Sequence, residues 1–276
     1  MCIRDRFRTE LKLMRQLHHP HIVQFLGTSV DPGTGLVSLC FEFMHKGSLD
    51  HMFRKMFNAE TGAPNITLAQ TVEMALDVAR GMAYLHGRKP LPVIHRDLKP
   101  GNLMLTRAGR VKIGDFGLSK TMSVRHKMPQ NLDDTFAMTG ETGSYRYMAP
   151  EVFRHEAYGP PVDVYAFAMI AYQCFTWRRP FESYSGVEAA QAAAINGVRP
   201  SLTGVRNKKV VKMLTQAWAP NPDMRPTFAE LLSTLQDIQK EMAPVGVDLS
   251  RVSTTNATGT TIGMNGPEGC AGCAIS

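Results

Sequence analysis

Three short groups of residues carry the strongest chemical signal in the sequence. The segment His95–Asn102 reads HRDLKPGN and holds a carboxylate, a lysine and an amide close together. Asp115–Gly117 adds a second carboxylate, and Ala149–Glu151 follows further along the chain. Any one of these pieces could arise by chance, but their order and spacing indicate a single site.

In this order the three groups resemble the signature of the eukaryotic protein kinases. Phosphoryl transfer holds an acceptor hydroxyl in line with the γ-phosphate of ATP and neutralises charge on the phosphate oxygens. We expect Asp97 to accept or orient the hydroxyl proton and Lys99 to supply a cation to the same cleft. Asn102 and Asp115 offer oxygen ligands to magnesium, a hard cation that prefers them. The cofactors implied are ATP and Mg²⁺.

The resemblance assigns structural roles to five further residues. His95 is expected to pack against Phe116 and not to take part in catalysis. Asp163 matches the helix aspartate that anchors the backbone of the catalytic loop. Glu151 and Arg225 match a buried ion pair, and breaking such a pair costs about 3–5 kcal/mol.

Residues 39–44, LCFEFM, resemble the strand and hinge that hold adenine in this family. Phe41 falls at the gatekeeper position and predicts a closed back pocket, while Glu42 and Met44 would bind adenine through backbone groups. Met104 would lie beneath the ring, and Ser48 completes the expected nucleotide-binding set. The alternative for the apolar members is an ordinary role in the core.

The class of kinase follows from residues around the same groups. Lys99 resembles serine/threonine kinases, as does Gly143-Ser144, whose hydroxyl would bond the catalytic aspartate and lysine. Residues 138–151 and 162–169 look like the tyrosine-kinase-like group, with the Raf-like and integrin-linked-kinase-like branch the best match. The resemblance implies protein substrates with serine or threonine acceptors.

Hydroxyl residues between the second and third groups suggest regulation by an upstream kinase. Thr139 and Thr142 are the candidates for phosphorylation, and Ser144 lies in the same loop. Arg96 would pair with the added phosphate, which carries up to about two negative charges. The alternative is that these residues are plain loop hydroxyls.

The part of the kinase signature that grips the ATP phosphates does not precede the other groups. Glu10 matches the helix glutamate whose partner is the ATP-positioning lysine, yet neither that lysine nor a Gly-rich loop comes before it. Residues 1–6 fit no element and are interpreted as a non-native scar. We expect the chain alone to have negligible kinase activity and its full-length parent to be active.

A pseudokinase or scaffold that only binds partners is the second class of function considered. Its mark would be loss of the residues that bind metal or accept the proton. Asp97, Asn102 and Asp115 are all present, which argues against this reading.

The elements that position these residues predict an α+β, two-lobed kinase fold. Residues 7–44 would form an incomplete N-lobe and hinge, 45–242 a complete and mainly helical C-lobe, and 243–276 a flexible tail. Periodic apolar residues predict the helices Phe7–Leu17, Leu68–Leu85, Ser183–Ile195, Lys208–Trp218 and Thr227–Met242. Strands are expected at Ile22–Leu26 and Leu36–Phe43, joined by a Gly-rich turn.

Composition limits the remaining possibilities. The net charge is +7 with no arginine-rich run, so nucleic-acid binding is not expected. Five scattered cysteines favour a reducing, cytoplasmic location over a disulfide framework. The longest apolar stretch, Val162–Phe175, is too short and too polar to span a bilayer.

The last four residues, CAIS, fit a C-a-a-X prenylation signal at Cys273. A palmitoyl group on Cys270 would give the second lipid that stable membrane anchoring needs. The alternatives are coincidence in a tail of small residues and, more weakly, zinc binding by the two cysteines. Membrane association through this tail is therefore an expectation beside the cytoplasmic one.

Overall fold

A computed structural model describes residues 11–57, 66–116, 119–121 and 144–242. The chain divides into two units, Met1–Met242 and Ala243–Ser276, and the second lies outside the described residues. Five residues with predicted roles also lie outside them: Glu10, Thr139, Thr142, Cys270 and Cys273.

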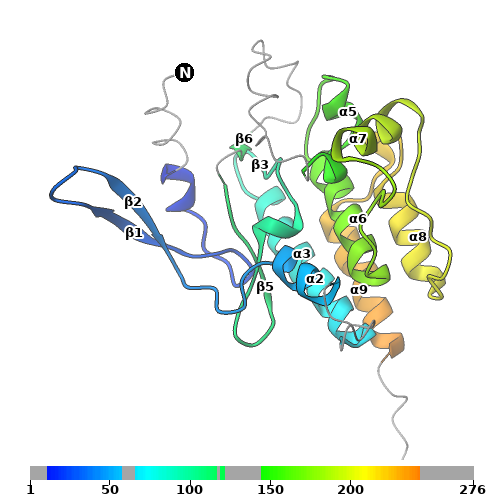
Figure 1. Ribbon diagram of the computed structural model, residues 1–276, viewed down its shortest axis with the longest axis horizontal. Coiled ribbons are helices and arrows are strands. Elements are labelled where there is room, and N and C mark those ends of the chain that lie inside the picture. Colours follow the sequence, from blue (N-terminus) through cyan, green and yellow to red (C-terminus); the bar gives the residue numbers. More distant parts are fainter. Residues whose placement is uncertain (1–10, 58–65, 117–118, 122–143, 243–276) are drawn as a thin grey trace, which may run out of the picture. The chain divides into compact units, whose positions relative to one another are not determined.

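An antiparallel hairpin forms most of the described N-terminal part, as Figure 1 shows in blue. Its strands are β1 (Phe25–Val30) and β2 (Val37–Phe41), and residues 11–14 before it are helical. In the turn, one carboxylate oxygen of Asp31 accepts hydrogen bonds from the backbone N–H groups of Gly33 and Thr34 at 2.9 and 2.7 Å. This turn chemistry is the one that the sequence predicted.

The first predicted strand begins too early, because Ile22 does not belong to β1. Ile22 instead forms an isolated parallel bridge with Ile113. The N–H of Val23 donates to the Ile113 carbonyl at 2.8 Å, and the Ile113 N–H donates to the His21 carbonyl at 2.9 Å. These bonds hold the segment against another part of the chain before the hairpin starts. The second strand is also shorter than predicted.

Helices dominate the chain after the hairpin (Figure 1). They are α2 (Leu49–Phe57), α3 (Leu68–His86), α5 (Pro150–Phe153), α6 (Pro161–Thr176), α7 (Gly186–Ile195), α8 (Lys208–Ala217) and α9 (Phe228–Met242). Helix α6 is buried from Val162 to Cys174 and packs against α3 and α8, while α3 also packs against α9. None of the described helices has the length and apolar character needed to cross a membrane.

Helix α7 starts three residues later than predicted, because Ser185 is its N-cap. The Ser185 hydroxyl accepts from the Glu188 N–H at 3.3 Å, and the Glu188 carboxylate accepts from the Ser185 N–H at 2.8 Å. This reciprocal capping satisfies two backbone donors that the helix itself cannot.

Short strands and 3₁₀ turns that sequence periodicity did not reveal frame the catalytic groups. The strands are β3 (Val93–Ile94), β4 (Leu103–Leu105), β5 (Val111–Ile113) and β6 (Lys120–Thr121), paired β3 with β6 and β4 with β5. The 3₁₀ turns are η1 (Pro100–Asn102), η2 (Ser144–Tyr147) and η3 (Pro222–Met224). The catalytic segment runs from β3 into η1, and Asp115 follows β5.

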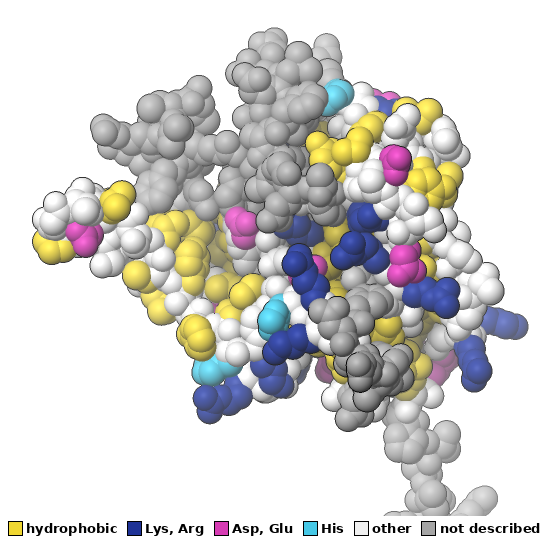
Figure 2. Space-filling model, viewed as in Figure 1, with side chains coloured by type: hydrophobic (Ala, Val, Ile, Leu, Met, Phe, Trp, Pro, Cys, Tyr) yellow, Lys and Arg dark blue, Asp and Glu magenta, His cyan; other side chains and the backbone are white. Residues whose placement is uncertain are grey.

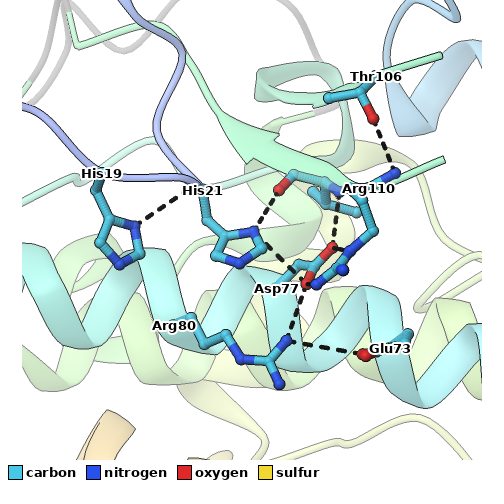
Figure 3. A network of polar contacts seen from close by, with 8 residues as sticks. His19, His21, Glu73, Asp77, Arg80, Thr106 and Arg110 are labelled. Atoms are coloured by element: carbon cyan, nitrogen blue, oxygen red, sulfur yellow. Dashed lines mark hydrogen bonds and ion pairs between the residues drawn. The ribbon is translucent and has the colours of Figure 1, made fainter. Parts of the chain in front are cut away.

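A buried carboxylate on α3, that of Asp77, joins three separate segments (Figure 3). It accepts from Arg110 Nε at 2.8 Å, from the Val111 N–H at 3.0 Å and from Arg80 Nη1 at 3.1 Å. His21 Nδ1 lies 3.0 Å from the Val111 carbonyl and 3.5 Å from Asp77 Oδ1. The network therefore ties α3, β5 and the loop before the hairpin to one another.

Removal of the Asp77 carboxylate should be expensive, because it leaves a buried N–H and guanidinium groups without their acceptor. We expect Asp77→Ala to lower the free energy of unfolding by about 3 kcal/mol, a value kept moderate because Arg110 is nearly half exposed. Urea denaturation of both proteins measures the difference.

Asp237→Ala is the matched control, since Asp237 is 53% exposed and forms a surface ion pair with Lys240 at 3.3 Å. Its loss should cost at most about 1 kcal/mol. Equal effects of the two substitutions would show that the Asp77 network does not contribute specifically to stability.

Candidate active site

The catalytic segment brings four predicted residues into direct contact. Asp97 is 6% exposed, and its Oδ2 lies 2.9 Å from the Lys99 ammonium. Lys99 also donates to the Ser144 hydroxyl at 3.0 Å. Asn102 Nδ2 donates to the Asp97 carbonyl at 2.8 Å and to its Oδ2 at 3.1 Å. These bonds fix the orientation of the Asp97 carboxylate.

The backbone of this segment is held by Asp163, which α6 carries in its first turn. Asp163 is 1% exposed and accepts from the N–H groups of His95 and Arg96, each at 2.9 Å. His86 Nε2 at the end of α3 lies 2.8 Å from the same carboxylate. Arg96 needs this support because its φ of 72° lies in the left-handed region, which is costly for residues other than glycine.

The charge state of Asp163 suits this anchoring role. Burial by itself raises the pKa of the carboxyl group, since it disfavours the charged form. The hydrogen bond and charge of His86, the charge of His95 and the Arg96 N–H act the other way. The net pKa lies below its ordinary value. Asp163 therefore remains an acceptor for the two backbone N–H groups.

His95 lies behind the catalytic residues, as a packing residue should. The ring is fully buried, its Nε2 lies 3.0 Å from the Gly114 carbonyl, and its centre is 5.3 Å from that of Phe116. Met14 and Phe25 are buried in the same core cluster. This cluster thus connects the helical residues before the hairpin and the start of β1 with the segment that carries Asp115.

The two predicted magnesium ligands come from neighbouring strands. Asn102 lies directly before β4, and Asp115 follows β5, its partner strand. The Gly114 N–H donates to the Asn102 carbonyl at 2.8 Å, which keeps the two segments together. Because Asn102 Nδ2 is occupied by Asp97, the amide presents its oxygen as the remaining polar atom, and Asp115 is exposed. Two oxygen donors fit a magnesium ion, which takes its other ligands from water and phosphates.

The hinge glutamate, Glu42, uses its carboxylate for structure. Lys112 Nζ lies 2.6 and 2.8 Å from its two oxygens, and the Gln24 N–H donates to Oε1 at 2.7 Å. The Glu42 N–H in turn donates to the Gln24 carbonyl at 3.0 Å. The hinge is therefore fixed to β5. These bonds use the carboxylate and the N–H of Glu42, and its carbonyl stays the predicted contact for adenine.

The other nucleotide-binding candidates lie along the same edge. Met44 is buried, and Ser48 forms an isolated antiparallel bridge with Met104 on β4. Phe41 is 39% exposed and packs edge-on against Phe25 at 5.7 Å between ring centres. Phe41 is thus only partly covered, and its gatekeeper role stays a prediction.

Apolar side chains of the hairpin are strongly exposed, and Figure 2 shows hydrophobic side chains gathered over it. The exposed fractions are 66% for Leu26, 67% for Leu36 and 77% for Phe43. Apolar strand residues that are uncovered in this way make the hairpin prone to association with other chains.

The ion pair between Glu151 and Arg225 is present and buried. Arg225 Nη1 lies 2.6 Å from Glu151 Oε1, and its Nη2 donates to Oε2 at 2.9 Å. Arg225 also donates to the carbonyls of Ala219 and Pro161. The pair joins α5, which contains Glu151 of the third signature group, to the segment before α9.

Several residues that orient the site were not predicted from the sequence. Lys112 holds the hinge, His86 supports Asp163, and Arg146 connects η2 to the segment before α7. A signal for Arg146 existed, because a charged residue stands between Ser144 and Ala149 in an otherwise weakly polar stretch. Nothing in the sequence distinguishes Lys112 from a solvent-exposed lysine on a strand.

The fold and this site together define a protein kinase domain, in which a catalytic loop with an oriented aspartate lies on a mainly helical C-lobe. The chain belongs to the protein tyrosine and serine/threonine kinase family, which it matches over residues 2–235. The kinase fold and the tyrosine-kinase-like group expected from the sequence are confirmed.

Three curated relatives come from Arabidopsis thaliana. Serine/threonine-protein kinase VIK is 41% identical over 248 residues, which cover 88% of this chain and 52% of the relative. Serine/threonine-protein kinase STY46 is 32% identical, with 90% and 40% covered. Serine/threonine/tyrosine-protein kinase HT1 is 31% identical, with 92% and 61% covered. The chain thus spans about half the length of these relatives.

Loss of one partner of the buried ion pair should destabilise the protein strongly. We expect Arg225→Met to lower the free energy of unfolding by about 3–5 kcal/mol, because it leaves the Glu151 carboxylate buried and unpaired. The double variant Arg225→Met, Glu151→Leu should recover a large part of that loss. Chemical denaturation of the single and double variants measures the coupling, and strictly additive effects would contradict it.

Proposed function

We propose that the full-length protein is a serine/threonine kinase that transfers the γ-phosphate of ATP to hydroxyl groups of protein substrates. The contact series Asp97–Lys99–Ser144 carries this proposal. A lysine held between the catalytic carboxylate and a hydroxyl is the arrangement that the sequence associated with serine/threonine kinases. The relatives VIK and STY46 are named serine/threonine-protein kinases, which agrees with this proposal.

In the proposed reaction, the substrate hydroxyl is oriented by the Asp97 carboxylate, which accepts its proton. The hydroxyl oxygen forms a bond to the γ-phosphorus while the bond from that phosphorus to the bridging oxygen breaks, so that ADP leaves. Lys99 reduces the negative charge that gathers on the transferred group. Asn102 and Asp115 would hold magnesium, which when bound neutralises charge on the phosphate oxygens.

A radioactive phosphate-transfer assay with full-length protein, ATP, magnesium and myelin basic protein tests the function. Asp97→Asn should lower kcat by about 10²–10⁴-fold, because a general base is lost. Ser144→Ala should lower kcat about tenfold, as expected for one lost hydrogen bond, while Ser144→Thr should retain activity. Asp223→Asn, on exposed η3, is the control and should behave like the wild type.

Phosphoamino-acid analysis of the product separates the possible outcomes. Label on serine and threonine supports the proposal. Label on tyrosine alone would overturn the assignment of acceptor, and transfer no faster than that of Asp97→Asn would overturn the assignment as a kinase.

We also propose that an upstream kinase phosphorylates Thr139 or Thr142, both outside the described residues. Arg96 directly precedes the catalytic aspartate, so a phosphate bound to it would act on the catalytic loop. When both proteins are isolated from their own cells, the variant with both threonines replaced by alanine should be less active than the wild type. After phosphatase treatment the two proteins should have equal activity. Equal activity of the double variant and the wild type before phosphatase treatment would refute the idea.

A further inference from the structure

We propose that Arg146 is a positioning residue for the protein substrate. It holds the segment Pro180–Tyr184 in a fixed place relative to Asp97, and that segment contacts the substrate. This inference rests on the proposed kinase function, because it concerns how the acceptor protein binds. Arg146 does not touch the reacting atoms and is assigned no chemical step.

The Arg146 side chain spends its hydrogen bonds on the backbone of that one segment. Nη1 donates to the carbonyls of Phe181 at 2.5 Å and Pro180 at 3.2 Å, and Nη2 donates to the Tyr184 carbonyl. The residue is only 8% exposed, and the three acceptors named above are all backbone carbonyl oxygens. A guanidinium group is suited to this task, since its donors form a rigid planar fork.

Burial of this charge is costly, which makes a purely accidental contact a poor explanation. Desolvation and the neighbouring charge of Arg179 both lower the pKa of Arg146. The three carbonyl dipoles offset part of that cost. What the protein gains is a defined geometry for a segment that belongs to no helix or strand.

The other side of η2 reaches the catalytic residues. Ser144 on the same turn accepts from Lys99 at 3.0 Å, and Lys99 lies 2.9 Å from Asp97. Tyr147, also on η2, donates its hydroxyl proton to Gln173 of α6 at 2.6 Å. The turn is therefore fixed at two places, and Arg146 extends it to the Pro180–Tyr184 segment.

The outer side of the segment is available to a partner. Glu182, Ser183 and Tyr184 have exposed side chains, whereas their backbone is held from the inside. Ser183 and Tyr184 also line an open groove of about 360 Å³ along α7. Helix α7, which borders this groove, packs against η2, and Ser144 of η2 contacts Lys99 beside Asp97. We therefore expect a protein chain with its hydroxyl at Asp97 to extend toward this surface.

A second arginine provides a closely matched control. Arg199 also donates to three carbonyls, those of Trp218 at 3.0 Å, Ala193 at 3.1 Å and Val198 at 2.8 Å. Its pKa is likewise lowered, first of all by desolvation. Within the described part of the chain Arg199 forms no hydrogen bond or ion pair with η2, so its loss should lower stability without changing the binding of the acceptor protein.

The experiment compares wild type, Arg146→Met, Arg146→Lys and Arg199→Met in the full-length protein, with myelin basic protein as acceptor. For Arg146→Met we expect KM for the acceptor to rise about tenfold, with kcat and KM for ATP within about twofold of wild type. Arg146→Lys keeps the charge but reaches fewer carbonyls, so its KM for the acceptor should lie between those of the wild type and of Arg146→Met. Arg199→Met should lower Tm and leave all three kinetic constants unchanged.

Hydrogen exchange measured on the same proteins gives a readout that does not need activity. Arg146→Met should speed exchange of the Tyr184 amide, which donates to the Phe181 carbonyl at 3.0 Å, and Arg199→Met should not. An unchanged acceptor KM in Arg146→Met, or an equal rise in Arg199→Met, would overturn the proposal. Absence of transfer by the wild type would overturn the proposed function instead, and unchanged exchange at Tyr184 would then overturn this inference separately.

Discussion

The catalytic site depends on one buried carboxylate, that of Asp163. It accepts the backbone N–H groups of His95 and Arg96 and so keeps Arg96 in a left-handed conformation that it would otherwise leave. Because α6 is buried along almost its whole length, the carboxylate has little freedom to follow a displaced loop. The position of Asp97, the next residue, is therefore set by a buried helix of the C-lobe.

The same design recurs elsewhere in the chain: a charged side chain, buried or half-buried, binds backbone groups of an irregular segment. Glu42 does so for the Gln24 N–H, and Arg146 for three carbonyls before α7. Irregular segments carry function but have no ladder of hydrogen bonds of their own. Charged groups on helices and strands supply those bonds and also set the distance between segments.

The apolar periodicity of the sequence predicted the helices well. The site residues were predicted from the resemblance to protein kinases. Helix α3 was recognisable because its apolar residues repeat with the helical period over nineteen residues. Strands of two or three residues such as β3 and β4 have no period to detect, and β1 was displaced because residues 21–23 pair with β5. Tertiary pairing of this kind overrides local propensity. The role of Lys112 depends on a partner far along the chain, so no local pattern could reveal it. For Arg146 the sequence offers a charge in a weakly polar stretch, but not the segment that it binds.

The attachment of the hairpin has a mechanical consequence. It is bound to the C-lobe strand β5 at two neighbouring residues, at Ile113 through residues 21–23 and at Lys112 through Glu42. The first attachment leaves no slack, because a Cβ atom on Gly81 would lie 2.8 Å from the His21 carbonyl and 2.7 Å from Ile113. Because both attachments are to adjacent residues of one strand, a displacement of β5 would carry the hinge and the base of the hairpin with it.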